Sequence, residues 1–303
     1  MTVVAALVPV FALIALGAVL HRTRFIDEAS WRAVERVTYY VLFPCFLFNA
    51  IAAADFTGQP VGRLALVLVG AIAVMALVVY ALRPVLKLDG PAFSSVFQGA
   101  LRFNSYVAIG AIAAILGSKG VALSAIAVAI MVPLLNTLCV SVLVRHAADG
   151  ESTFAMFARQ FAQNPLIMSC LAGIAVQFAS IPLPAVAATT VDMVGKAALP
   201  LGLLAVGASL DLADARARPA PVIVATLLRL FLMPLLVAVG ALAVGLPGIA
   251  KTAALICAAV PGASSSFILA RQLGGDAPLM ANITTAQTLA AMVTMPLILW
   301  VFA

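Results

Sequence analysis

The stretch VFQGALRFNSYVAIGAIAAILG, residues 96–117, decides the fold because it places polar side chains at the centre of an otherwise apolar run. Arg102, Asn104 and Ser105 have mainly apolar neighbours on both sides. In a hydrocarbon environment polar groups survive only where they find partners inside the protein or line a cavity. These three residues therefore indicate either a broken helix or a contact between helices.

The composition of the whole chain is that of a membrane protein with several spans. Of its 303 residues 65% are hydrophobic and 9% are charged, and the mean hydropathy is +1.19. A membrane-spanning helix needs about 20 apolar residues. The sequence predicts ten such runs, at 2–20, 37–56, 64–82, 91–117, 121–144, 165–181, 186–210, 221–244, 252–270 and 277–302.

The cysteines and histidines give no sign of a metal site or of a disulfide framework. All four cysteines lie inside apolar runs without CxxC spacing, and both histidines stand at the ends of runs. We therefore expect no metal and no cofactor. The net charge of +6 is explained by the loops between the runs, so no nucleic-acid partner is expected.

The distribution of basic residues predicts the orientation of the chain in the membrane. Loops after odd-numbered runs contain eleven Lys and Arg residues, whereas loops after even-numbered runs contain three. Basic residues accumulate on the cytoplasmic side. The odd loops are therefore predicted to be cytoplasmic and both termini to be extracytoplasmic, in a multi-pass protein of the bacterial inner membrane.

An internal repeat is visible when the sequence is shifted by 156 residues. The shift superposes Pro9 on Pro165, Gly17 on Gly173, Pro44 on Pro200, Asp55 on Asp211 and Pro91 on Pro247. Because each half would contain five runs, the second half must enter the membrane inverted, as in many secondary transporters. The predicted fold is all-α, with ten transmembrane helices as a 5+5 inverted repeat and broken, crossing helices 4 and 9.

The same shift carries Asn104 to position 260, directly before a second polar interruption. Pro261 has no N–H and would clash with the carbonyl of Cys257, so a continuous helix is expected to fail there. Two half-helices with free N–H groups would then meet near the midplane and bind an anion such as a carboxylate. The alternative is that these residues only form interhelical hydrogen bonds or a simple kink. The predicted substrate-binding residues are Arg102, Asn104, Ser105, Pro261, Gly262, Ala263, Ser264 and Ser265.

At these residues the sequence resembles the auxin efflux carrier family, and its bacterial malonate or organic-acid transporter branch most. The motifs are RFNSYVAIG (102–110), NPLIMSCLAGI (164–174), GKAALPLGLLAVGASL (195–210) and VPGASSSFILARQLGGDAPLMA (260–281). The sequence departs from the plant pattern at Phe103, where plant members have Pro, and at Gly262–Ala263, where they have Gln-Gly. It also lacks their long central loop, so auxin is not supported as the substrate.

The resemblance implies a division of the chain into scaffold and transport units. Scaffold helices 1–2 would occupy residues 1–56, transport helices 3–5 residues 57–146, a linker with scaffold helices 6–7 residues 147–212, and transport helices 8–10 residues 213–303. It further implies elevator-like transport of organic anions and a homodimer formed through the scaffold helices.

Charged residues inside the apolar runs need partners, because an Arg at the bilayer centre costs about 2.5–3.5 kcal/mol. Arg102 could bind a carboxylate bidentately or cap the last carbonyls of the first half-helix. Asp192 and Lys196 are four residues apart and are expected to form an internal ion pair; a proton-coupling site is the alternative. Arg229 would face the interior or extend to the interface. Polar residues predicted to support the crossover are Asn136, Asn282 and Gln287.

The leading function is secondary transport of small organic anions, since no phosphate-binding GxxxxGK[ST] motif indicates coupling to ATP. A sodium-coupled symporter of the bile-acid type is the alternative within transport, with a proton or sodium ion as coupling ion. A membrane enzyme is disfavoured, because neither histidine lies near the serine run 264–266. A receptor without transport activity is a third class, although no signalling domain is attached.

Overall fold

The computed structural model describes residues 3–54, 58–146, 163–179, 182–210 and 218–303, and within these ranges the secondary structure is entirely helical. The first half contains α1 (Val3–Arg22), α2 (Glu28–Val37), η1 (Thr38–Leu42), α3 (Phe43–Ala52), α4 (Val61–Leu86), α5 (Gly90–Leu101) and α6 (Ser105–His146). The second half contains α8 (Pro165–Phe178), α9 (Ala185–Lys196), α10 (Ala198–Ala208), α11 (Pro219–Leu227), η2 (Leu228–Leu232), α12 (Met233–Ala243), α13 (Gly248–Ala259), α14 (Ser265–Gln272) and α15 (Ala277–Phe302).

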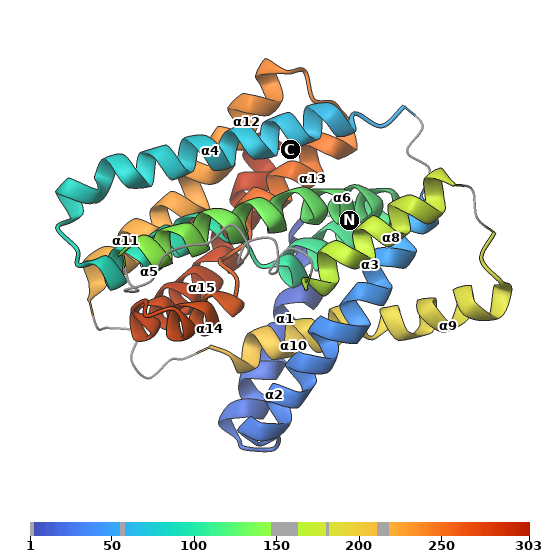
Figure 1. Cartoon of the computed structure of the whole chain (residues 1–303), viewed down its shortest axis with the longest axis horizontal. Coiled ribbons are helices and arrows are strands. Elements are labelled where there is room, and N and C mark those ends of the chain that lie inside the picture. The colour runs from blue at the N-terminus through green and yellow to red at the C-terminus, as the bar shows by residue number, and fades with distance from the viewer. Residues whose placement is uncertain (1–2, 55–57, 147–162, 180–181, 211–217) are drawn as a thin grey trace.

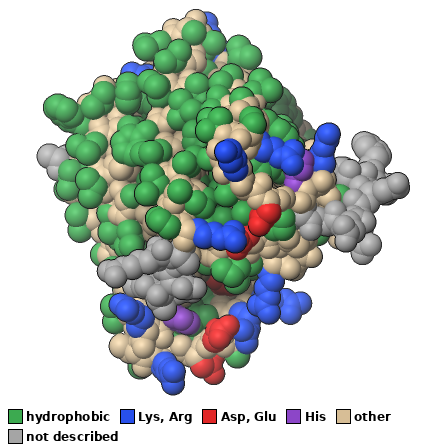
Figure 2. Space-filling model, turned by 90° about the vertical axis from the view of Figure 1, so that its left-hand side faces the viewer, with side chains coloured by type: hydrophobic (Ala, Val, Ile, Leu, Met, Phe, Trp, Pro, Cys, Tyr) green, Lys and Arg blue, Asp and Glu red, His purple; other side chains and the backbone are tan. Residues whose placement is uncertain are grey.

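Among the described residues, six helical stretches are long and apolar enough to cross a membrane: 3–22, 61–86, 90–146, 185–208, 219–243 and 277–302. Figure 2 shows the matching surface, with broad areas of hydrophobic side chains and most of the charged side chains gathered toward the lower part and the right edge of the face. The prediction of an all-helical membrane protein with several spans is confirmed. The ten crossings and their 5+5 arrangement stay predictions.

The boundary between the predicted runs 91–117 and 121–144 has a local cause in the backbone. In α6, Gly117 has φ 63° and ψ −157°, so one helical stretch contains the end of the first run and the whole of the second, with a kink between them. Glycine tolerates this positive φ without a steric penalty. The residues Asp55 and Asp211, paired by the sequence repeat, lie outside the described residues.

Two π-helical turns, η1 and η2, each occur directly before a proline. In η1 the N–H of Phe43 bonds to the carbonyl of Thr38, and Pro44 follows. In η2 the N–H of Met233 bonds to the carbonyl of Leu228, and Pro234 follows. A proline ring clashes with the carbonyl four residues earlier, and widening the preceding turn relieves that clash.

Two helix pairs show the internal repeat at the level of packing. A Cβ on Gly17 of α1 would overlap the carbonyl of Leu204 in α10. A Cβ on Gly173 of α8 would lie 3.0 Å from the carbonyl of Phe48 in α3. Gly17 and Gly173 differ by 156 residues, and so do Phe48 and Leu204. The repeat found in the sequence thus corresponds to equivalent close helix contacts.

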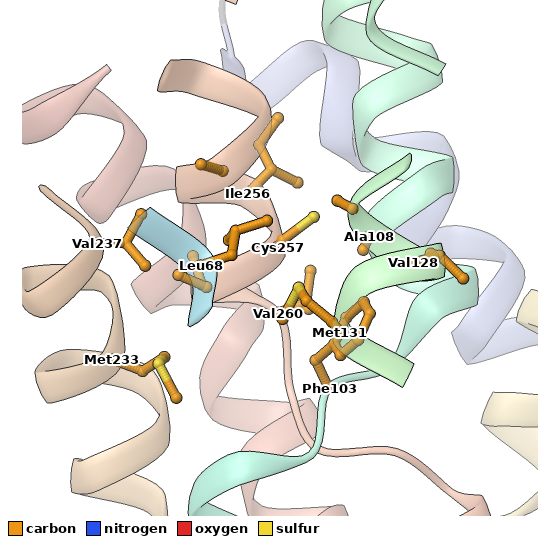
Figure 3. Packing of buried hydrophobic residues seen from close by; sticks show 14 of the residues in the cluster. Leu68, Phe103, Ala108, Val128, Met131, Met233, Val237, Ile256, Cys257 and Val260 are labelled. Atoms are coloured by element: carbon orange, nitrogen blue, oxygen red, sulfur yellow. The ribbon is translucent and has the colours of Figure 1, made fainter. Parts of the chain in front are cut away.

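One large hydrophobic cluster joins the helices around the two polar interruptions. Figure 3 shows Phe103, Met131 and Val260 close together in this cluster, although they come from the connection after α5, from α6 and from the end of α13. All three are at most 4% exposed. Tightly packed apolar side chains therefore lie beside both interruptions.

Candidate functional site

Both predicted helix breaks are present, and they have the same backbone geometry. The helix α5 ends at Leu101 and α6 begins at Ser105, while α13 ends at Ala259 and α14 begins at Ser265. The first residue after each helix is extended, with φ −70° and ψ 145° at Arg102 and φ −73° and ψ 154° at Val260. The amide of each donates to the carbonyl four residues earlier.

The structural equivalence corrects the register of the repeat at this place. Both α5 and α13 contain 12 residues and start with glycine, at Gly90 and Gly248, which gives a shift of 158 rather than 156. Arg102 therefore corresponds to Val260, whereas the shift of 156 had placed Asn104 there. The two additional residues enter earlier in the chain, because eight residues separate α3 from α4 whereas ten separate α10 from α11.

A direct hydrogen bond joins the two breaks. The backbone N–H of Asn104 donates to the carbonyl of Pro261 at 2.9 Å. The helices also cross in space, because α13 packs on α6 and α14 packs on α5. Figure 1 shows α5 and α6, in green, passing through the middle of the molecule close to α13 and α15. We refer to residues 102–105 and 260–265 together as the crossover.

Asn104 is a capping residue in this arrangement. Its side-chain oxygen accepts from the N–H groups of Tyr106 at 3.1 Å and Val107 at 3.2 Å, and the residue is 2% exposed. This is the preferred role of Asn at a helix start, where the first N–H groups have no partner in the helix. Asn104 therefore fixes the position at which α6 begins.

Gln287 of α15 holds both breaks at once. Its side-chain oxygen accepts from the N–H of Gly262 at 2.8 Å, and its amide donates to the carbonyls of Gly99 at 2.9 Å and Ala225 at 3.1 Å. Gln287 is fully buried. A Cβ on Gly262 would lie only 2.6 Å from the Gln287 oxygen, so glycine is needed at this position.

Arg102 places a cation beside the start of α14. Its guanidinium donates to the Asn136 side chain at 3.0 Å and to the Ser265 hydroxyl at 3.2 Å. These contacts differ from the alternative in which the guanidinium caps the carbonyls of α5. Among the described residues, none of the recorded ion pairs includes Arg102. Its charge is therefore available to an anion.

The crossover is accessible on the side where the second half-helices begin. Arg102 and Ser105 are partly exposed and Ser265 is exposed, whereas Asn104, Pro261 and Gly262 are buried. Ala263 and Ser264 are partly exposed. Within the described part of the chain, the hydroxyl oxygens of Ser264 and Ser266 are buried without a hydrogen-bond partner. The accessible side thus combines a cation, hydroxyl groups and two helix N-termini.

Other polar residues of α15 are mostly satisfied within their own helix. Thr284 donates to the carbonyl of Met280, and Thr288 donates to that of Thr284. Asn282 is 2% exposed, and its side-chain oxygen has no partner among the described residues. Gln287, by contrast, forms hydrogen bonds to Gly99 near the end of α5 and to Gly262 in the second break.

The sequence did not assign a partner to Arg229, and the structure provides two. Its guanidinium donates to the carbonyls of Val260 at 3.0 Å and Cys257 at 2.8 Å. One carbonyl belongs to the last turn of α13 and the other to the first residue after it. The sequence indicated only that a charged residue lies inside the apolar run 221–244. Its partner Val260 is 31 residues away and could not be identified from the sequence.

Asp192 and Lys196 form the predicted ion pair, and Asn49 of α3 also donates to Asp192 at 3.1 Å. The pair is not internal as expected, because the Lys196 side chain is 73% exposed. A cavity of about 350 Å³ lies at the ends of α3 and α8 and beside α9. Its lining includes Asn49 and Gln177 and no residue of the crossover.

Comparison with known proteins indicates a membrane transporter, which is the class of protein that the sequence motifs predicted. The family model described as "Membrane transport protein" matches residues 150–299. An uncharacterized transporter of Methanothermobacter thermautotrophicus is 24% identical over 293 residues, which cover 95% of this chain and 94% of that protein. Sodium/bile acid cotransporter 4 is 36% identical in Homo sapiens and 34% in Rattus norvegicus over 110 residues.

The bile acid cotransporter match is partial, since it covers 35% of this chain and only 25% of the human protein. The family model includes the second helix break, and the match to the archaeal transporter extends over both halves of the chain. Together they support the assignment of this chain to the auxin efflux carrier family.

Proposed function

We propose that this protein is a secondary active transporter that moves small organic anions, mono- or dicarboxylates, across the bacterial inner membrane. The proposed binding residues are Arg102, Asn104, Ser105, Pro261, Gly262, Ala263, Ser264 and Ser265. The observation that carries the proposal is the hydrogen bond between Asn104 and Pro261, which brings the two breaks together beside the Arg102 guanidinium.

The chemistry of the crossover favours an anion for two reasons. First, a helix N-terminus has about half a positive charge, and here two such ends adjoin. Second, Arg102 adds a full charge whose planar fork matches a carboxylate. Asn104 and Gln287 take part by fixing the backbone, so the ligand would contact mainly Ser105, Ser265 and Arg102.

The transport cycle in this proposal is alternating access with an elevator-like movement. The crossover would move as one body because Gln287 links α15 to both breaks. The scaffold would be the helices that pack through Gly17 and Gly173, and it would form the homodimer. Support for an inverted 5+5 repeat comes from the equivalent glycine contacts and the matching breaks.

Flux into liposomes tests the proposal. The purified protein is reconstituted, and uptake of ¹⁴C-labelled acetate, lactate, succinate and malonate is measured with an imposed pH or sodium gradient. Arg102→Gln should lower uptake at least about tenfold, whereas Arg63→Gln, which removes the same charge from an exposed site bonded to the carbonyl of Gly245, should transport normally. Equal flux by the two variants would exclude Arg102 from the site.

Sodium coupling of the bile-acid type is a second candidate, favoured by the 110-residue match to sodium/bile acid cotransporter 4. A carboxylate near the crossover would favour cation binding. Glu35 of α2 is a partly buried carboxyl, but burial raises its pKa, which favours the neutral acid over the carboxylate that a sodium site requires. Uptake that requires a sodium gradient and persists without a pH gradient would establish this alternative; uptake with the opposite dependence would exclude it.

A further inference from the structure

Arg229 is a fully buried cation on the π turn η2. Among the described residues no recorded ion pair includes it. Burying a charge costs several kcal/mol unless hydrogen bonds and an opposite charge compensate. The compensation comes from the carbonyls of Cys257 and Val260, which accept from Nη2 and Nε.

The position of these carbonyls places Arg229 at the negative end of the α13 dipole. A helix C-terminus has about half a negative charge, so it neutralises only part of the guanidinium. The Nη1 atom is buried, and no hydrogen-bond partner for it is recorded in the described ranges. A net positive charge of about one half therefore remains behind the second break.

A short stretch of backbone connects the carbonyl that Arg229 contacts to the accessible side of the crossover. Val260, which it contacts, is followed by Pro261, whose carbonyl accepts from Asn104, and by Gly262, whose amide is bonded to Gln287. The start of α14 lies a few residues further on. Five peptide units connect Val260 to Ser265, so an anion at the start of α14 would lie within about 20 Å of the guanidinium.

We infer that Arg229 is a positioning residue whose fixed positive charge attracts the transported anion to the crossover, in addition to holding the last turn of α13. This inference rests on the proposed function, because it requires an anion at the crossover. It assigns to Arg229 an electrostatic role that Arg102 does not replace. At about 10–20 Å and an effective dielectric constant of about 20, removing the unit charge of Arg229 should weaken anion binding roughly 4- to 16-fold.

Two substitutions separate the charge from the hydrogen bonds. Arg229→Gln keeps a donor for a carbonyl and removes the charge, whereas Arg229→Lys keeps the charge. If Arg229 acted only by holding the end of α13, any change in anion affinity would follow the change in melting temperature. The control Arg36→Gln removes a charge from an exposed position on α2.

The experiment measures equilibrium binding of ¹⁴C-succinate and ¹⁴C-acetate to purified protein, together with the melting temperature of each variant. Expected are a roughly 4- to 16-fold weaker binding by Arg229→Gln, a change below about twofold in Arg229→Lys and none in Arg36→Gln. Equal affinities of the Gln and Lys variants overturn the inference. If wild-type protein binds neither probe, the proposed function fails first, and the inference with it.

A third variant keeps the test decisive if Arg229→Gln does not fold. In Arg229→His the charge depends on pH, so succinate affinity is compared at pH 6 and pH 8, each divided by the wild-type value at the same pH. The inference requires at least about threefold tighter relative binding at pH 6. An unchanged ratio overturns it.

Discussion

Replacing Gln287 with leucine tests whether one side chain holds the two breaks together. Leucine has a similar volume, so the loss is limited to three hydrogen bonds, with Gly262, Gly99 and Ala225. Each leaves a buried backbone group without its partner, at a cost of about 1–3 kcal/mol. The substitution should therefore destabilise the protein by at least about 3 kcal/mol.

The matched control is Thr288→Val on the next position of α15. Thr288 is also fully buried, but its hydroxyl donates only within its own helix, to the carbonyl of Thr284. Its replacement should cost about 1 kcal/mol or less.

Thermal unfolding of both variants in detergent provides the measurement. At about 2–4 °C for each kcal/mol, Gln287→Leu should lower the melting temperature by at least about 6 °C, and Thr288→Val by less than about 4 °C. Equal melting temperatures for the two variants would refute the assignment of Gln287 as the link between the breaks.

Three further substitutions follow from the contacts. Asn104→Ala removes the cap of α6 and should cost about 1 kcal/mol while abolishing most uptake in liposomes; wild-type flux from a folded variant would contradict the site. Gly17→Ala should lower the melting temperature because its Cβ would overlap α10, whereas Gly70→Ala in α4, where the space is open, should raise it slightly; the opposite order would contradict the packing. Reversing both charges of Asp192 and Lys196 should restore more expression, measured by fluorescence of a fused reporter, than reversing either alone, and an equal yield would show that the pair contributes nothing.

The breaks were predictable because their causes are local. Pro261 interrupts a helix whatever surrounds it, and Arg102, Asn104 and Ser105 are polar residues in an apolar run. Asn104 was also recognisable as the start of a half-helix, since Asn is a preferred N-cap. Local chemistry thus indicated both interruptions.

The partners of the polar side chains were not predictable in the same way. Arg229 and Gln287 bind carbonyls that lie 28 to 188 residues away, and such pairs depend on how helices pack. The exposure of Lys196 and the register of 158 at α5 and α13 likewise depend on packing and loop length. A single sequence contains the spacing within a helix but not the contacts between helices.

The central claim, that a carboxylate binds between the two helix starts, is tested most directly by a distance. Protein labelled with ¹⁵N-serine is reconstituted with succinate labelled with ¹³C in its carboxyl groups, and ¹³C–¹⁵N dipolar dephasing is measured by solid-state NMR. The account predicts dephasing from serine amides within about 4 Å of the carboxylate, lost when Ser105 and Ser265 are both replaced by unlabelled alanine. Bound succinate without such dephasing, or dephasing unaffected by the two substitutions, would contradict it.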